Sequence, residues 1–185
     1  MLHANDKREK LLDAATDLIH GQGYSQTSLA DISKVSGVPL GNVYYYFKTK
    51  DDLLEAVVKK RADQFHDMFD DWDKLPHPKQ RLLAFLKMAE GIREVLTKQG
   101  CPIGSLCQEL AKDSTPLATK AGNILKDALE WVSSQYQQMG RKDAAALGIQ
   151  FVASLQGGIL LAGALDDSGI LLKQLEQLQQ HVNEL

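Results

Sequence analysis

The sequence predicts an all-α protein, and two features of the chain support this fold class. Apolar residues recur every three or four positions between the glycines and prolines, which is the spacing of amphipathic helices. Two capping pairs, Ser28 with Asp31 and Thr49 with Asp52, are typical of helix starts. The 185 residues are 44% apolar and 24% charged, which is ordinary for a soluble globular chain and excludes disordered and fibrous classes. We expect about nine helices.

The head of the molecule is expected in residues 1–50 as three helices. An amphipathic helix is predicted for residues 7–20, and Gly21 and Gly23 follow it. Its apolar face is formed by Leu11, Ala15, Leu18 and Ile19. Residues 28–50 predict two short helices joined by a tight turn, because Gly37 can end the first and Pro39 can open the second. The pattern is that of a helix-turn-helix.

The second short helix presents an unusual outward face. Val43 and Phe47 share one side at i and i+4, whereas Gly41, Asn42 and Tyr45 lie opposite. Four consecutive aromatics, from Tyr44 to Phe47, cover every side of a helix, so a purely buried aromatic stripe does not account for them. Tyrosine hydroxyls and lysines can contact phosphates, and an asparagine can pair with a base edge. These properties favour contact with duplex DNA.

Residues 27–53 resemble the DNA-binding head of the tetracycline-repressor (TetR) family. The resemblance is carried by Thr27, the Leu-Ala-Asp-Ile run, and Ser-Gly-Val-Pro-Leu-Gly-Asn-Val-Tyr-Tyr-Tyr-Phe-Lys-Thr-Lys-Asp-Asp-Leu. It implies base contacts from Pro39, Leu40, Gly41, Asn42 and Tyr45, and phosphate contacts from Thr27, Ser28, Tyr44, Lys48 and Lys50. Leu40 departs from the polar or basic residue that relatives often carry, so it can offer only apolar contact, for example to a thymine methyl.

A long helix over residues 51–73 is predicted to connect head and body within residues 51–75. Its apolar positions are Leu54, Val58, Phe65, Met68, Phe69 and Trp72. At 1.5 Å per residue it would span roughly 35 Å, which makes it a lever between the two parts. Pro76 and Pro78 then break the chain and open the body, residues 76–185.

The body begins with a predicted helix from Leu82 to Leu96 that Gly100 closes. Pro102 is expected as the first residue of the next helix, which places Cys101 at its N-cap and Cys107 on its buried stripe. A thiolate is stabilised at a helix N-terminus, so Cys101 is the candidate reactive thiol. A plain structural role for both cysteines outweighs this sensor interpretation, and a direct disulfide between them is out of reach.

Three more helices are predicted from Thr115 to the C-terminus. In the first, Trp131 and Tyr136 flank the apolar stripe and could line a ligand cavity, although such aromatics are more often core. Residues 142–165 are rich in small residues, and residues 168–185 carry a leucine seam. The seam consists of Leu171, Leu175, Leu178, Val182 and Leu185. It suggests a homodimer through residues 142–185, with burial inside one chain as the alternative.

Charge and composition limit the partners of the chain. The formal net charge is −3, and residues 1–60 carry equal numbers of basic and acidic side chains, so DNA contact must come from a local patch. The N-terminus lacks the apolar region of a signal peptide, and the longest apolar stretch is interrupted by glutamines and glycines. We therefore expect a cytoplasmic protein without a membrane span. Two cysteines make no four-ligand zinc site, and no cofactor or metal is expected.

These observations favour a one-component transcription regulator, most simply a repressor released from a palindromic operator. The effector would be a small molecule in the body or a thiol-reactive compound at Cys101. A helical thiol-dependent redox enzyme using Cys101 and Cys107 is the alternative, but the chain lacks a C-x-x-C pair. A pure protein-interaction module would leave the exposed tyrosine and lysine face unexplained.

Overall fold

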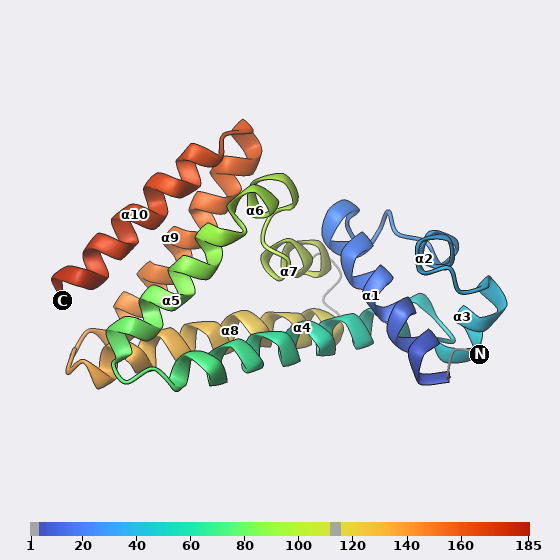
Figure 1. Cartoon of the computed structure of the whole chain (residues 1–185), viewed down its shortest axis with the longest axis horizontal. Helices are drawn as coiled ribbons and strands as arrows, with labels where there is room; N and C mark the ends of the chain where they lie inside the picture. The colour runs from blue at the N-terminus through green and yellow to red at the C-terminus, as the bar shows by residue number, and fades with distance from the viewer. Residues whose placement is uncertain (1–3, 112–115) are drawn as a thin grey trace.

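The computed structural model describes residues 4–111 and 116–185, which fold into helices without a strand. The all-α fold class is confirmed. In chain order the helices are α1 (Ala4–Gln22), α2 (Leu29–Ser36), α3 (Leu40–Tyr46), α4 (Lys50–Asp73), α5 (Pro78–Gly91), α6 (Arg93–Gln99), α7 (Gly104–Leu110), α8 (Pro116–Gln138), α9 (Ala144–Leu165) and α10 (Ser168–Glu184). Helices α1 to α3 form a head at one end, and α5 to α10 form the body (Figure 1).

The head is built as the sequence predicts. Ser28 and Asp31 form a reciprocal capping box at the start of α2. Gly37 ends α2 with a φ of 68°, a left-handed conformation that favours glycine. Pro39 is the N-cap of α3, and Val43 and Phe47 turn inwards to the core of the head. The anchored side of α3 thereby fixes which of its side chains face outwards.

Helix α4 connects the head to the body, and its predicted start at the Thr49 and Asp52 capping box is confirmed. It runs along the body beside α8 (Figure 1). Its far end is held by an aromatic cluster with Phe85 of α5 and Trp131 of α8, in which the Phe69 and Trp131 rings stack at 4.8 Å. Such aromatic pairs stabilise beyond their buried area. The end of α4 remote from the head is therefore fixed to the body by aromatic packing.

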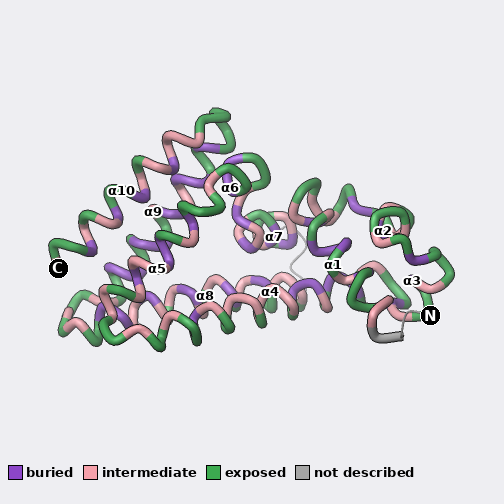
Figure 2. The backbone as a smooth tube through the Cα atoms, in the orientation of Figure 1, coloured by how far each residue is buried: buried purple, intermediate pink, exposed green. Residues whose placement is uncertain are grey.

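The core of the body lies where α5, α8, α9 and α10 face one another, as the buried segments in Figure 2 show. Gly148 and Gly158 of α9 permit close approach, because an added Cβ would meet Ser133 of α8 and Gln174 of α10. By length and composition α9 could also cross a membrane, a test that core helices of soluble proteins pass as well. Its outer face carries exposed apolar side chains: Ile149, Leu160, Leu161 and Leu165.

Two predicted helix boundaries in the body are wrong. The helix expected from Leu82 to Gly100 is broken into α5 and α6, since the chain leaves helical geometry at Ile92, directly after Gly91. Helix α7 begins at Gly104 instead of Pro102, because residues 101–103 form a turn. Cys101 therefore does not occupy the N-cap, which is Ile103. Thr115, the predicted start of the following helix, lies outside the described residues.

The leucine seam of the last helix is internal to the chain. Leu171, Leu175, Leu178 and Val182 are buried, with at most 5% of each residue exposed, against the neighbouring helices of the same chain. Their spacing of three and four residues is equally that of a core face, and here the core face is realised. The exposed apolar side chains of the last two helices lie on α9 instead, at Ile149, Leu160, Leu161 and Leu165.

Candidate nucleic-acid interface and effector cavity

The outward face of α3 is an exposed set of side chains on a short, anchored helix. Tyr45 is 71% exposed, Tyr44 50% and Leu40 39%, high values for large apolar groups. Asn42 is half-buried, and Gly41 is exposed with open space where a Cβ would stand. Pro39 precedes the helix and Lys48 follows it, both exposed. The four aromatics divide as expected: Phe47 is buried, whereas Tyr44 and Tyr45 face solvent.

A shallow hollow joins this face to the start of α2. It is lined by Ser25, Gln26, Thr27, Ser28, Leu29, Ala30, Leu40, Tyr44 and Lys50. Five of the residues that the resemblance singles out, Thr27, Ser28, Leu40, Tyr44 and Lys50, are thus brought together from separate segments. Ser25 and Gln26, which the sequence pattern does not single out, complete the rim. They precede α2 without any helical pattern, so only their neighbourhood to Thr27 could have indicated them.

The polar residues of this hollow differ in exposure and in the contacts that they already make within the chain. Lys50 Nζ lies 4.2 Å from the centroid of the Tyr24 ring, a cation–π contact. Ser28 is exposed, although its hydroxyl takes part in the capping box. Thr27 is only 1% exposed, and its hydroxyl donates to Gly23 O at 2.7 Å. Thr27 therefore supports the loop before α2 and presents little surface to a partner.

The loop between α1 and α2 is held by a carboxylate of the body. Glu109 of α7 accepts hydrogen bonds from Tyr24 N at 2.9 Å, Ser25 N at 2.6 Å and Ser25 Oγ at 2.5 Å. Burial would raise the pKa of Glu109, but the hydrogen bonds from Ser25 and Tyr24 and the nearby Lys50 lower it below its ordinary value. The ionised carboxylate therefore links α7 to the segment that opens α2.

A second body contact reaches the C-terminal end of α1. His20 Nε2 lies 3.0 Å from the carbonyl oxygen of Gly100, the residue that ends α6. Burial lowers the pKa of His20, and the hydrogen bond to Gly100 opposes this only in part. Together with the bonds of Glu109, this contact joins the head to the segment that runs from the end of α6 through α7.

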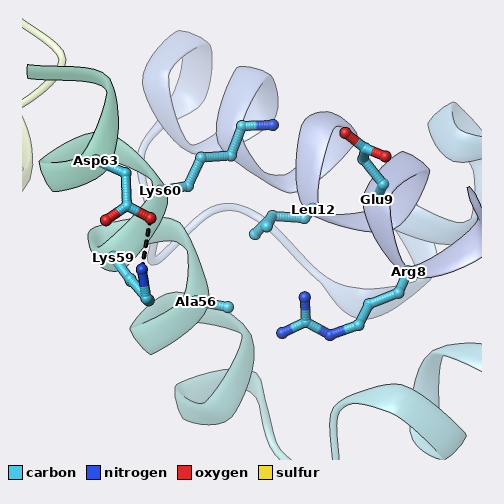
Figure 3. Close-up of a pocket in the computed structure, with 7 residues that line it drawn as sticks. All are labelled: Arg8, Glu9, Leu12, Ala56, Lys59, Lys60 and Asp63. Atoms are coloured by element: carbon cyan, nitrogen blue, oxygen red, sulfur yellow. Dashed lines mark hydrogen bonds and ion pairs between the residues drawn. The ribbon is translucent and has the colours of Figure 1, made fainter. Parts of the chain in front are cut away.

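A polar hollow lies between α1 and α4, and Figure 3 shows the seven residues that line it. Arg8 extends from α1 into the hollow towards Ala56 of α4. Lys59 pairs with Asp63 at 2.5 Å within α4, and Lys60 pairs with Asp13 of α1. The hollow is therefore a polar contact between the two helices, and the Lys60–Asp13 pair joins them directly.

A larger and mostly apolar cavity of about 530 Å³ lies inside the body. Its size falls within the range of small-molecule sites in proteins. Its apolar wall is formed by Phe65, Met68, Phe85, Met88, Ala89, Ile92, Leu96, Pro102, Leu125, Ala128, Val152, Leu155 and Ile159. Its polar groups come from Arg61, Gln64, Asp67, Cys101 and Gln156. Helix α4 supplies five of the lining residues, so the cavity adjoins the helix that leads to the head.

Of the four residues that the sequence suggested for an effector site, one lines the cavity and three lie outside its lining. Cys101 lines the cavity, and its sulfur accepts hydrogen bonds from Gly104 N and Gln156 Nε2, both at 3.3 Å. Cys107, Trp131 and Tyr136 are not among the lining residues. Trp131 belongs to the aromatic cluster, where its indole N–H donates to Asp73, and Tyr136 is fully buried core.

The two cysteines differ from their predicted positions, since Cys107 is not fully buried and Cys101 is not at the N-cap. Cys101 is only 8% exposed, whereas Cys107 is half-buried, because α7 starts two residues later than expected. Burial raises the pKa of the Cys107 thiol to about 11. The polar cavity residues Arg61, Gln64 and Gln156 were missed, since Arg61 and Gln64 of α4 are brought to Gln156 of α9 only by the packing of segments far apart in the sequence.

Comparison with known proteins agrees with this arrangement. Residues 11–57 match the family described as bacterial regulatory proteins, tetR family, and residues 78–177 match the LmrA/YxaF-like C-terminal domain of transcriptional regulators. The second match covers more than half of the chain. The chain belongs to the TetR family. It is thus a DNA-binding transcription regulator, which is a different class from the redox enzyme considered above.

Relatives of this TetR-family chain match over nearly its whole length. The uncharacterized HTH-type transcriptional regulator YxaF of Bacillus subtilis is 31% identical over 96% of each chain. The HTH-type transcriptional regulator LmrA of the same organism is 33% identical over 90% of this chain and 92% of its own. A TetR-family regulator from Agrobacterium tumefaciens has the same fold, with a TM-score of 0.86 at 21% identity over 97% of this chain and 98% of that one.

Proposed function

We propose that this TetR-family regulator is a cytoplasmic repressor that binds a palindromic operator as a homodimer. The observation that carries the proposal is the outward face of α3, where Tyr44 and Tyr45 are exposed on an anchored helix. In a helix-turn-helix dimer the two reading helices lie about 34 Å apart, one turn of the duplex. No observation favours a second function.

The proposed DNA contacts divide by chemistry. Leu40, Gly41, Asn42 and Tyr45, with Pro39, would meet base edges in the major groove. Ser28, Tyr44, Lys48 and Lys50 would contact phosphates and fix the register of the helix. Thr27 is left out of the interface, because its side chain is buried and already hydrogen-bonded. Ser25 and Gln26 are added as exposed neighbours of the same hollow.

The proposed effector is a small organic molecule in the 530 Å³ cavity. A ligand that fits one position of α4 better than another would shift the population of head orientations and lower operator affinity. A thiol-reactive effector at Cys101 is less favoured, because this cysteine is 8% exposed and its sulfur is engaged by two N–H groups. Operator release by N-ethylmaleimide that is lost in Cys101→Ser would reverse this preference.

The proposed dimer interface uses the exposed face of α9 together with α10, within residues 142–185. The supporting observation is the exposed apolar strip of Ile149, Leu160, Leu161 and Leu165. In this proposal residues 1–50 read DNA, residues 51–75 transmit the effector signal, and residues 76–185 hold the effector and the partner subunit.

The DNA-binding proposal is tested by gel shift with the DNA upstream of the protein's own gene. The double variant Tyr44→Ala, Lys50→Ala should bind at least about tenfold more weakly at moderate salt, because it loses two phosphate contacts. Lys87→Ala, an exposed lysine of α5, is the matched control and should bind like the wild type. Equal binding by the double variant and the wild type would refute the assignment of α3.

A further inference from the structure

The basic and the acidic residue that line the cavity lie at different positions on α4. Among its lining residues the basic group is Arg61, in the middle of α4, while the acidic one, Asp67, lies on an exposed part of the same helix. Arg61 and Asp67 are six residues apart, which corresponds to about 9 Å along a helix axis. The two charges therefore do not neutralise each other at close range.

Arg61 is a half-buried guanidinium without a close carboxylate partner. None of the ion pairs within 4 Å among residues 4–111 and 116–185 involves it. Its Nη1 donates to Gln64 Oε1 at 3.1 Å, and within residues 4–111 and 116–185 its other N–H groups make no further hydrogen bond. Burial lowers the pKa of Arg61, and the nearby carboxylate of Asp17 offsets this only in part. A half-buried, unpaired cation gains from an incoming anion.

The groups around Arg61 add hydrogen-bonding capacity at the same end of the cavity. Gln64 lies one turn along α4, and Cys101 is close enough to Arg61 to act on it electrostatically. Gln156 of α9 bonds to Cys101 through its amide N–H. The remaining wall is apolar and includes the rings of Phe65 and Phe85 and the thioethers of Met68 and Met88. Methionine sulfur and aromatic faces both suit aromatic ligands.

We propose that the cavity binds an aromatic organic acid whose ionised acid group pairs with Arg61 and whose ring lies among Phe65, Phe85, Met68 and Met88. The acid group would accept hydrogen bonds from the guanidinium and the amide of Gln64 or Gln156. The inference rests on the effector role proposed above, whose ligand class it specifies. It places the anion next to Cys101, one residue from Gly100, whose carbonyl meets His20 of the head.

The test compares two probes that differ in charge but hardly in shape, 2-naphthoic acid and 2-naphthamide. Binding to the full-length protein at neutral pH is measured by titration calorimetry without DNA. The acid should bind about tenfold more tightly than the amide, or better, because only the carboxylate forms a charge-assisted pair with Arg61. Equal affinity for the two probes, or no binding by the acid, would overturn the proposal.

Variants of one side chain attribute the effect to Arg61. Arg61→Gln should abolish the preference for the acid, whereas Arg61→Lys should retain most of it because the positive charge remains. Arg141→Gln is the matched control, since Arg141 is remote from the cavity and pairs with Asp143 at 2.8 Å. A preference for the acid that persists unchanged in Arg61→Gln would overturn the assignment. If Arg61→Gln does not fold, the two probes still decide on the wild type.

Operator release, measured separately, distinguishes this inference from the function on which it rests. If the acid binds through Arg61 but leaves the operator complex intact, the ligand class stands and the effector role fails. If the amide binds as tightly as the acid and either compound releases the operator, the effector role stands and the acid-specific inference falls.

Discussion

At the scale of single residues, replacing two glycines of the head by alanine should have opposite effects on the free energy of unfolding. Gly41 lies on the exposed face of α3 with open space where a Cβ would stand, whereas Gly37 has a φ of 68°. Gly41→Ala should leave the free energy of unfolding unchanged or raise it by up to about 1 kcal/mol, since alanine favours helices. It should weaken operator binding, because a methyl group would separate the helix from the groove floor.

Gly37→Ala is the matched comparison, with the same added methyl group at a different backbone conformation. It should lower the free energy of unfolding by about 1 kcal/mol, because alanine is strained at positive φ. Urea unfolding and gel shift on both variants check the pair. If Gly41→Ala bound the operator as well as the wild type, close approach of α3 to DNA at this residue would be excluded.

The cysteines give a residue-scale prediction with a defined pH window. Burial raises the pKa of Cys107 from 9.0 to about 11, so the folded state favours its neutral thiol. This contribution to stability is fully present below about pH 9 and is lost as the pH rises through about 11. In Cys101→Ser, alkylation of Cys107 by iodoacetamide should continue to accelerate above pH 9 in the folded protein, because burial, the larger cause of the raised pKa, remains. In urea it should level off near pH 9, and identical pH profiles would show that burial has no such effect.

At the scale of elements, Glu109 ties α7 to the loop that opens α2. Glu109→Ala removes the acceptor for three hydrogen bonds and should lower the free energy of unfolding by about 1 to 2 kcal/mol at pH 7. Amide hydrogen exchange in residues 23–28 should accelerate more than in α10. Glu176→Ala, on the exposed side of α10, is the control and should change neither quantity. Unchanged exchange in residues 23–28 would show that Glu109 does not restrain the loop.

The lowered pKa of Glu109 sets the pH at which this link is lost. Its folded-state pKa lies below the ordinary 4.5, so the stabilisation is present above that pH and disappears as the pH falls through the folded-state value. The difference in unfolding free energy between the wild type and Glu109→Ala should therefore shrink below pH 4.5. A difference that stayed constant down to acid unfolding would indicate that the carboxylate charge is not involved.

The sequence predicted the elements that are defined by residues close together in the chain. It did not predict features that depend on contacts between residues far apart in the chain. The capping boxes at Ser28 and Thr49 are local, and both helix starts were predicted to within one residue. The break at Ile92 directly follows Gly91, whose low helix propensity is a weak local signal that the apolar spacing outweighed, and the late start of α7 follows from the turn at residues 101–103. The exposed face of α3 followed from helical spacing, whereas Arg61 and Gln156 meet at the cavity only after folding.

At the scale of the whole molecule, the described residues attach the head to the body in two places. Helix α4 is continuous from the head to the aromatic cluster around Phe69, and one wall of the cavity belongs to it. The segment from the end of α6 through α7 provides the second attachment through Gly100 and Glu109. Cys101 and Pro102 of this segment also line the cavity. A ligand in the cavity would therefore contact both attachments between head and body.

The oligomeric state also belongs to this scale, and the exposed strip on α9 makes it testable. Leu160 is 61% exposed and Leu161 52%, although α9 buries its opposite face in the core. The double variant Leu160→Glu, Leu161→Glu should therefore fold but place charge in the proposed interface, where burial without a partner is costly. Light scattering should find the chain mass of 20.5 kDa for the variant and twice that for the wild type.

Val95→Glu is the control for the dimer test, because Val95 is an apolar residue of α6 that is 44% exposed and does not belong to the α9 strip. It should remain dimeric. A palindromic operator is bound tightly only when both half-sites are engaged together, so the monomeric α9 variant should lose affinity with its α3 residues intact. A variant that stayed dimeric would place the interface elsewhere, and a monomeric variant that bound the operator undiminished would show that each head reads its site alone.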